Sequence, residues 1–192
     1  NYIVSLGSVC KWLGEVAEGL GVEIYPGFSA AEVLFNDDGS VKGVATGDMG
    51  VSREMEAKDS WEAGMELHAK FTLFSEGTRG SLSKFLIDNF NLSEGKDFQK
   101  YAIGLKEVWE IKEENFSEGL VEHSMGWPLS DGTNGGSFLY HFDKNLVSIG
   151  YVIHLNYTNP YASPFDEFQQ FKTHPSVKKT LIGGKRLSYG AR

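Results

Sequence analysis

Cysteine is nearly absent from this chain, with Cys10 the single example in 192 residues. A disulfide needs two thiols and an iron–sulfur cluster needs several, so these residues alone supply neither. Basic residues are also few, since 18 Lys and Arg stand against 26 Asp and Glu for a net charge of −8. Binding to nucleic acid depends on clustered basic side chains. The chain has no such cluster, so no nucleic-acid partner is expected.

Three other kinds of signal are missing. No apolar run approaches the roughly 18–20 residues that span a bilayer. The chain opens on Asn1 without a starter methionine or a basic leader, so no targeting peptide is expected. The five histidines lack the paired spacings of zinc sites, and no G-x-S-x-G nucleophile elbow occurs. Metal-centred and serine-nucleophile chemistry are therefore not expected.

The residues that are present favour a folded globular protein. Hydrophobic residues make up 41% of the chain and charged residues 23%, which is typical of a packed core with a polar surface. The 23 glycines exceed the average share and indicate tight turns or a backbone close to a ligand. The length suits one large domain or parts of two.

The first half of the chain predicts a mixture of helices and strands. Apolar spacing predicts a helix over residues 9–20, capped by Ser5 or Ser8. The remaining elements expected here are a strand at 22–25, a hairpin of 32–35 and 41–46, a surface excursion over 47–64, a strand at 67–74 and a helix from Ser81. The near-continuous apolar order of 67–74 predicts a strand buried on both faces, as in a parallel sheet.

Beyond about residue 100 the apolar period changes to two. Such alternation predicts an antiparallel sheet with one covered face. Its strands are expected at 101–111, 119–125, 137–141 and 146–157. A helix is then expected after Ser163, with Phe165, Phe168 and Phe171 turned inward. A βαβ-like half thus joins an antiparallel half, and both ends look cut from a longer protein.

The strongest local signal for chemistry is the turn at residues 76–81. Here a strand runs into Glu-Gly-Thr-Arg-Gly-Ser and then a helix. Glycines at a helix N-terminus expose backbone N–H groups and a positive dipole end, which suit a phosphate. Glu76 could accept a hydrogen bond from a ribityl or ribose hydroxyl, and Arg79 could pair with a pyrophosphate. The spacing also fits an ordinary strand-to-helix turn with a solvated arginine.

A second glycine-rich segment covers residues 131–137 and begins at Asp131. Its adjacent glycines, Gly135 and Gly136, would let a flat ligand approach the backbone, whose N–H and C=O groups can bond carbonyl oxygens. A hairpin loop explains the same pattern without a ligand. The two interpretations stay open at this level.

Several motifs in order resemble the electron-transfer flavoprotein–ubiquinone oxidoreductase family. They are VEIYPGF (22–28), GLKEVW (104–109), GWPL (126–129), GGSFLYH (135–141), NPYASPF (159–165), GGKR (183–186) and YGAR (189–192). The similarity covers essentially the whole chain. Each motif is short, but their number and order make the resemblance specific.

The resemblance implies a glutathione-reductase-like FAD-binding fold, of the α/β or α+β class, with an antiparallel-sheet ubiquinone-binding region. It implies that residues 1–100 are part of the FAD-binding domain, 101–182 form the ubiquinone-binding domain and 183–192 begin a return to the FAD domain. The turn at 76–81 matches the second FAD-contacting motif of this class, often Asp-Gly where this chain has Glu-Gly. The residues then expected to contact FAD are Glu76, Gly77, Arg79, Gly80 and Ser81, with Ala30 and Ala31 near the adenine.

For the quinone, the resemblance implies a site at Gly135 and Gly136, with Trp127 and Pro128 helping to line the pocket. Electrons would pass from reduced electron-transfer flavoprotein, through FAD and a 4Fe–4S cluster, to ubiquinone in the respiratory chain. Such chemistry needs placement and tuned potentials, so no catalytic acid or nucleophile is assigned.

Much of this machinery is expected outside these residues: the G-x-G-x-x-G loop, the cluster ligands and the segment that contacts the membrane surface. The expected location is the mitochondrial inner membrane on the matrix side, or a bacterial inner membrane. The 192 residues alone are expected to be inactive.

Two other functions fit the same residues. One is another FAD-dependent enzyme of this fold, such as a hydroxylase or an isoprenoid reductase, which would oxidise NAD(P)H with its substrate. The other is a non-enzymatic β-rich assembly or binding subunit, whose full-length gene would lack both the glycine loop and a cysteine cluster.

Overall fold

The computed structural model describes residues 2–130 and 132–192, so Asp131 at the start of the second glycine-rich segment lies outside the described residues. The chain divides into two compact units. One is Gly21–Asp97, and the other combines Asn1–Leu20 with Phe98–Arg192.

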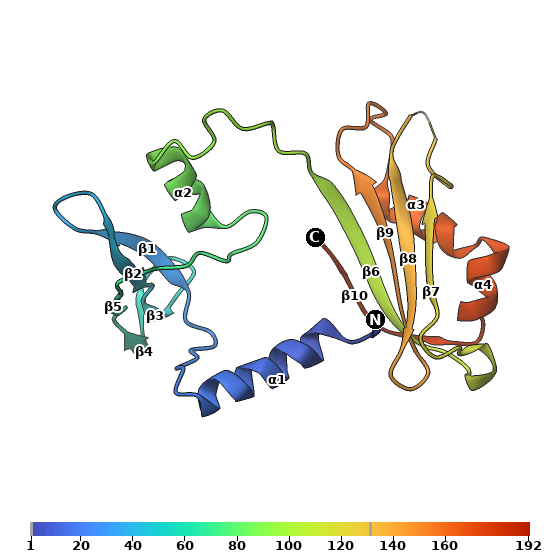
Figure 1. Ribbon diagram of the computed structural model, residues 1–192, viewed down its shortest axis with the longest axis horizontal. Coiled ribbons are helices and arrows are strands. Elements are labelled where there is room, and N and C mark those ends of the chain that lie inside the picture. Colours follow the sequence, from blue (N-terminus) through green and yellow to red (C-terminus); the bar gives the residue numbers. More distant parts are fainter. Residues whose placement is uncertain (1, 131) are drawn as a thin grey trace. The chain divides into compact units, whose positions relative to one another are not determined.

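The unit Gly21–Asp97 is built on a three-stranded antiparallel sheet with the order β1-β2-β5 (Figure 1). Its elements are β1 (Ala30–Phe35), β2 (Val41–Thr46), β5 (Glu66–His68), the separate pair β3 (Met49–Val51) and β4 (Ala57–Glu62), and α2 (Ser81–Asn89). The hairpin expected at 32–35 and 41–46 is confirmed, and Gly39 in its turn has a φ of 80°. Leu82 and Leu86 of α2 pack on Val33 of β1 and form a small core.

Two strands expected in this unit do not form. Residues 22–25 have no strand, and of residues 67–74 only Leu67 and His68 belong to the short antiparallel strand β5. Phe71 and Leu73 are 89% and 91% exposed, so the buried parallel strand expected there is wrong. An apolar run becomes a buried strand only where neighbours take its backbone hydrogen bonds and cover its faces. The polar excursion at 47–64 does contain strands, namely β3 and β4.

The other unit contains a five-stranded antiparallel sheet with the order β10-β6-β9-β8-β7. The strands are β6 (Ala102–Glu110), β7 (Val121–Met125), β8 (Gly135–Phe142), β9 (Leu146–His154) and β10 (Lys185–Ala191). Four of them confirm the strands expected from the period of two. Three helices, α1 (Leu6–Gly19), α3 (Pro164–Lys172) and α4 (Pro175–Leu181), and the 3-10 turn η1 (Glu113–Asn115) complete the unit.

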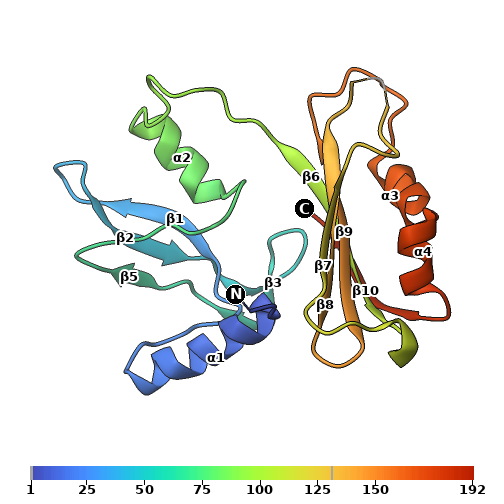
Figure 2. The same ribbon diagram turned by 45° about the vertical axis from the view of Figure 1, so that its right-hand side comes forward.

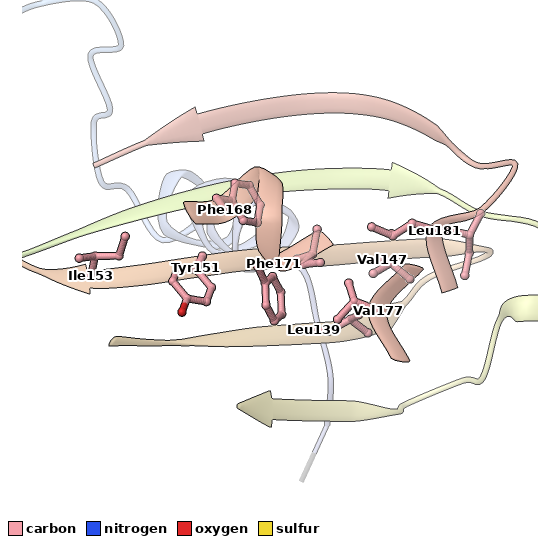
Figure 3. Packing of buried hydrophobic residues seen from close by; sticks show 10 residues of the cluster. Leu139, Val147, Tyr151, Ile153, Phe168, Phe171, Val177 and Leu181 are labelled. Carbon is pink, nitrogen blue, oxygen red and sulfur yellow. The ribbon is translucent and has the colours of Figure 1, made fainter. Parts of the chain in front are cut away.

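Helices α3 and α4 cover one face of this sheet, as Figures 1 and 2 both show. Of the inward residues that the alternation predicted, Val147, Ile149, Tyr151 and Ile153 of β9 are all buried. Leu155, the next in the alternation, lies beyond the end of β9 and is 48% exposed, so its inward position is wrong. Phe168 and Phe171 of α3 pack onto them (Figure 3). Phe165 is 58% exposed, so its expected inward position is wrong. It lies in the first turn of α3, where it lines an open hollow with Leu105 and Phe168.

The two ends of the chain add to the same unit. Helix α1 confirms the helix expected at 9–20, with Ser5 as its N-cap and Gly21, at a φ of 88°, directly after its end. Strand β10 lies at the edge of the five-stranded sheet beside β6, where a return to the FAD domain was expected. The assignment of residues 1–100, 101–182 and 183–192 to functional domains stays a prediction. Among the residues the structure describes, no helix is long and apolar enough to cross a membrane.

Candidate functional site

Gly135 and Gly136 open strand β8 between β7 and β9. A Cβ built on Gly135 would lie 2.3 Å from the carbonyl oxygen of Val152, and one on Gly136 would lie 2.4 Å from the carbonyl oxygen of Ser124. No side chain fits at such distances. The glycine pair is therefore required by the close approach of the neighbouring strand backbones, and the two glycines are strand residues and not part of a hairpin loop.

The same glycines line an open hollow of about 460 Å³, here called the glycine hollow. Its other lining residues are Met125, Gly126, Asn134, Val152 and His154. Glycines leave backbone atoms accessible at this surface, and a flat ring could lie against them. The geometry thus combines the accessible surface that the ligand interpretation requires with a backbone constraint that the sequence did not predict.

The loop that follows β7 is tied to the sheet by a buried tyrosine. The hydroxyl of Tyr151 lies 2.8 Å from the carbonyl oxygen of Gly126 and 3.0 Å from that of Trp127, and donates to this pair. Burial raises the pKa of Tyr151 to about 12, so the hydroxyl stays protonated and remains a donor. The backbone N–H of Leu129 closes the turn onto the carbonyl of Gly126 at 2.9 Å.

Trp127 faces a different hollow from the one that the glycine pair lines. Its ring lies 5.1 Å from that of His174, and both line a hollow of about 310 Å³ with Phe171 and Ser124. Met125 lines both hollows. Trp127 and the glycine pair are close in the sequence, but in the structure they line two adjoining hollows. Pro128 is half-buried in the loop between β7 and β8.

The residues expected at the flavin lie in the unit Gly21–Asp97, at the N-terminus of α2. Glu76 folds back onto this helix end, where its Oε2 accepts hydrogen bonds from the Ser83 N–H at 2.6 Å and the Ser83 hydroxyl at 2.7 Å. Its Oε1 accepts from the Leu82 N–H at 3.3 Å. The hydrogen bond from the Ser83 side chain, helped by those from the backbone, lowers the pKa of the Glu76 carboxyl.

The other members of this turn have distinct surroundings. Gly77 has a φ of 82°, a conformation that favours glycine. A Cβ on Gly80 would lie 2.3 Å from the Cβ of Glu76, so Gly80 makes the space into which Glu76 folds. Arg79 and Ser81 are exposed at the surface of the turn. The structure thus leaves the Arg79 guanidinium accessible to an anionic ligand.

Ala30 and Ala31 begin strand β1 in the same unit and are exposed. Strand β1 carries Val33, onto which α2 packs. The structure therefore places the two groups of expected flavin residues on elements that contact each other.

A buried charge cluster was missed at the sequence level. The Glu107 side chain is 3% exposed and accepts from Lys172 at 2.8 and 2.9 Å, from the Trp109 indole at 2.7 Å and from Arg186 at 3.2 Å. Burial raises the pKa of Glu107, but the hydrogen bonds from Lys172, Trp109 and Arg186 outweigh it and the net pKa is lowered. A charged residue at an inward position of an alternating strand was the signal available.

His141 is a second buried polar residue that sequence reasoning did not single out. It is 1% exposed, and its Nδ1 accepts from the Ser117 N–H at 3.0 Å. Burial lowers the pKa of this imidazole, so it is neutral at pH 7. Within the described residues, no group of three or more His, Cys, Asp and Glu side chains is arranged to hold a metal ion.

Comparison with protein families gives a match over the second half of the chain. Residues 101–192 match the family described as "ETF-QO, ubiquinone-binding". These residues include the whole five-stranded sheet, the glycine hollow and helices α3 and α4.

Similar proteins extend the resemblance to the whole chain. The electron transfer flavoprotein-ubiquinone oxidoreductase of Pseudomonas aeruginosa is 55% identical over 100% of this chain and 35% of its own length. The human mitochondrial protein of the same name is 56% identical over 100% of this chain and 31% of its own length. The resemblance predicted from the motifs is confirmed. The chain spans about a third of the length of these curated relatives.

Two solved structures have a fold similar to that of this chain. A triple mutant of the flavin-dependent brominase Bmp2 gives a TM-score of 0.59 at 17% identity, over 95% of this chain and 42% of that chain. The halogenase PltM gives a TM-score of 0.55 at 14% identity, over 92% of this chain and 34% of that chain. At such identities the likeness concerns the fold alone. It agrees with the mixed arrangement of helices and antiparallel sheets in this chain.

Proposed function

Because the resemblance to electron transfer flavoprotein-ubiquinone oxidoreductases covers every residue of this chain, we propose that it is a segment of such an enzyme. The full-length protein accepts electrons from reduced electron-transfer flavoprotein and delivers them to ubiquinone. The observation that carries this proposal is the identity of 55–56% over the whole chain. The fold of the segment is then part of a glutathione-reductase-like flavoprotein.

Ubiquinone is proposed to bind in the glycine hollow. Gly135 and Gly136 expose backbone there, so a flat quinone ring can approach closely enough for hydrogen bonds to its carbonyl oxygens. The buried Tyr151 hydroxyl holds the loop that forms one edge of this hollow. Trp127 and Pro128, on the same loop, are proposed to contact the part of the quinone that extends past Met125, which lines both the glycine hollow and the hollow beside Trp127.

FAD is proposed to bind through the turn at residues 76–81, and when bound it supplies the redox centre that exchanges electrons with both partners. The exposed guanidinium of Arg79 suits the pyrophosphate, and Gly77 lets the backbone turn toward it. Ser81 stands at the first turn of α2, while Ala30 and Ala31 are proposed to lie near the adenine. These residues bind and orient the cofactor and carry no proton in the reaction.

An iron–sulfur cluster is proposed for the full-length protein but cannot be held by this segment. The chain's one cysteine, Cys10, is exposed, and such clusters take several thiolate ligands. The proposed location is the mitochondrial inner membrane, matrix side, or a bacterial inner membrane, with membrane contact made by other parts of the protein. This follows the mitochondrial and bacterial relatives.

One preparation of the full-length protein tests the proposal. We expect tightly bound flavin, reduction of that flavin by reduced electron-transfer flavoprotein, and reoxidation by a soluble ubiquinone analogue. Arg79→Ala should release flavin more readily, since a hydrogen bond to a charged group contributes about 1.5–3 kcal/mol. Flavin that is reduced by NAD(P)H in the presence of a hydroxylatable or isoprenoid substrate, and ignores the flavoprotein donor, would instead indicate another enzyme of this fold.

A further inference from the structure

The N-terminus of α2 is already occupied by a side chain of this chain. The N-cap residue, Gly80, has no side chain with which to cap the helix. Glu76 does so instead, with Oε2 on the N–H and hydroxyl of Ser83 and Oε1 on the N–H of Leu82. Helix N-termini leave their first N–H groups without internal partners, and a carboxylate satisfies them well. Two of those N–H groups are thus unavailable to a phosphate.

The capacity of the Glu76 carboxylate decides what else it can do. An ionised carboxylate has about four positions that accept hydrogen bonds, two on each oxygen. Oε2 uses both of its positions, at 2.6 and 2.7 Å, on Ser83. Oε1 uses one, at the longer distance of 3.3 Å, on Leu82. One position on Oε1 is left for a ligand.

The geometry of the turn keeps the carboxylate in this orientation. A Cβ on Gly80 would lie 2.3 Å from the Glu76 Cβ and 2.5 Å from its Oε2, so only glycine leaves room for the side chain to fold back. Ser83 is half-buried and contributes both of its donors to the same oxygen. The side chain of Ser83 therefore restricts the rotation of the carboxylate about its terminal bond.

We propose that Glu76 receives a hydroxyl of the flavin's ribityl chain through Oε1 alone, and that Ser83 is the positioning residue that holds Oε2. This rests on the proposed function, because it assumes that the turn binds FAD. The pyrophosphate then takes its donors from Arg79 and from backbone upstream of Leu82. Ser83 affects flavin affinity without contacting the flavin.

The test measures FAD dissociation constants of the deflavinated full-length protein by flavin fluorescence, at a temperature where circular dichroism shows every variant folded. Ser83→Ala should weaken FAD binding by about threefold to tenfold, because one hydrogen bond to the carboxylate is lost. Ser83→Thr keeps the hydroxyl and should bind FAD within about twofold of the original protein. Ser93→Ala, an exposed serine on the turn after α2, is the matched control and should change nothing.

A double-variant comparison separates positioning from simple support of the helix. Glu76→Gln should weaken FAD binding by at least about tenfold, and Ser83→Ala should add nothing in that background. The positioning role is wrong if Ser83→Ala weakens FAD binding by the same factor in the original protein and in the Glu76→Gln variant. It is also wrong if Ser83→Thr binds FAD as weakly as Ser83→Ala. Unchanged FAD affinity in Ser83→Ala and in Glu76→Gln also overturns the positioning role. In that case the FAD bound by the original protein still supports the proposed function. A full-length protein that binds no FAD would overturn both.

Discussion

Removal of the Lys172 charge should destabilise the unit that contains the five-stranded sheet. Lys172 on α3 is 12% exposed and lies 2.8 Å from Glu107 on β6, which is 3% exposed. Lys172→Met keeps an apolar stem of similar length against the Phe168 ring, which the ammonium contacts at 4.8 Å. The substitution therefore removes the charge and leaves most of the packing.

The size of the effect follows from the burial of the carboxylate. Removing one partner of a buried ion pair costs about 3–5 kcal/mol, because the other charge stays buried without compensation. Arg186 and the Trp109 indole still bond Glu107, so the lower end, about 3 kcal/mol, is expected. Exposed pairs behave differently. Lys112→Met, which breaks a pair with Glu114 at 3.5 Å between largely exposed side chains, should cost less than about 1 kcal/mol.

Urea unfolding of the purified chain, with hydrogen exchange of the β6 and β10 amides to locate the transition, measures both variants. Because the pKa of Glu107 is lowered in the folded protein, its contribution is complete above the ordinary carboxyl pKa of about 4.3 and is lost as the pH falls through the folded value. In Lys172→Met this acid loss should begin at higher pH. Equal stability losses in Lys172→Met and Lys112→Met would refute the argument from burial.

Three further changes test the sheet and the loop beside it. Tyr151→Phe removes the donor to the carbonyls of residues 126 and 127 and should cost about 1–3 kcal/mol, with faster hydrogen exchange in that loop. Gly136→Ala places a Cβ 2.4 Å from the Ser124 carbonyl oxygen and should loosen β7, so an unchanged melting temperature would contradict the close strand approach. His141→Asn should reduce the loss of stability between pH 7 and pH 5, measured by urea unfolding at both values. Burial lowers the pKa of His141 in the folded protein, so its contribution to stability is complete above the unfolded pKa of about 6.5. That contribution is lost as the pH falls through the folded pKa.

The sequence predicted the elements whose signals are local. The alternation in residues 146–157 identified the buried side of β9, because successive side chains of a strand point to opposite faces. The hairpin of 32–35 and 41–46, the helix after Ser163, and Ser5 as one of the two caps expected for the first helix were also correct, since their signals lie within a few residues. The motif order likewise identified the family resemblance over the whole chain.

Predictions from the sequence were wrong where the outcome depended on distant partners. The apolar residues Phe71 and Leu73 favoured a buried strand, but burial requires a neighbouring strand and a cover that lie elsewhere in the chain. Strand β10 was missed because its stability comes from pairing with β6, about 80 residues earlier along the chain.

The candidate sites show the same division between local and distant information. A short segment of sequence is enough to show the glycine pair at residues 135–136 and to predict a helix after Glu76. The tertiary structure sets the close approach of two strand backbones to Gly135 and Gly136. It also decided that Lys172 and Arg186, 65 and 79 residues away along the chain, converge on Glu107. A side chain's partners are set by which segments pack together, and packing maximises burial over the whole unit at once.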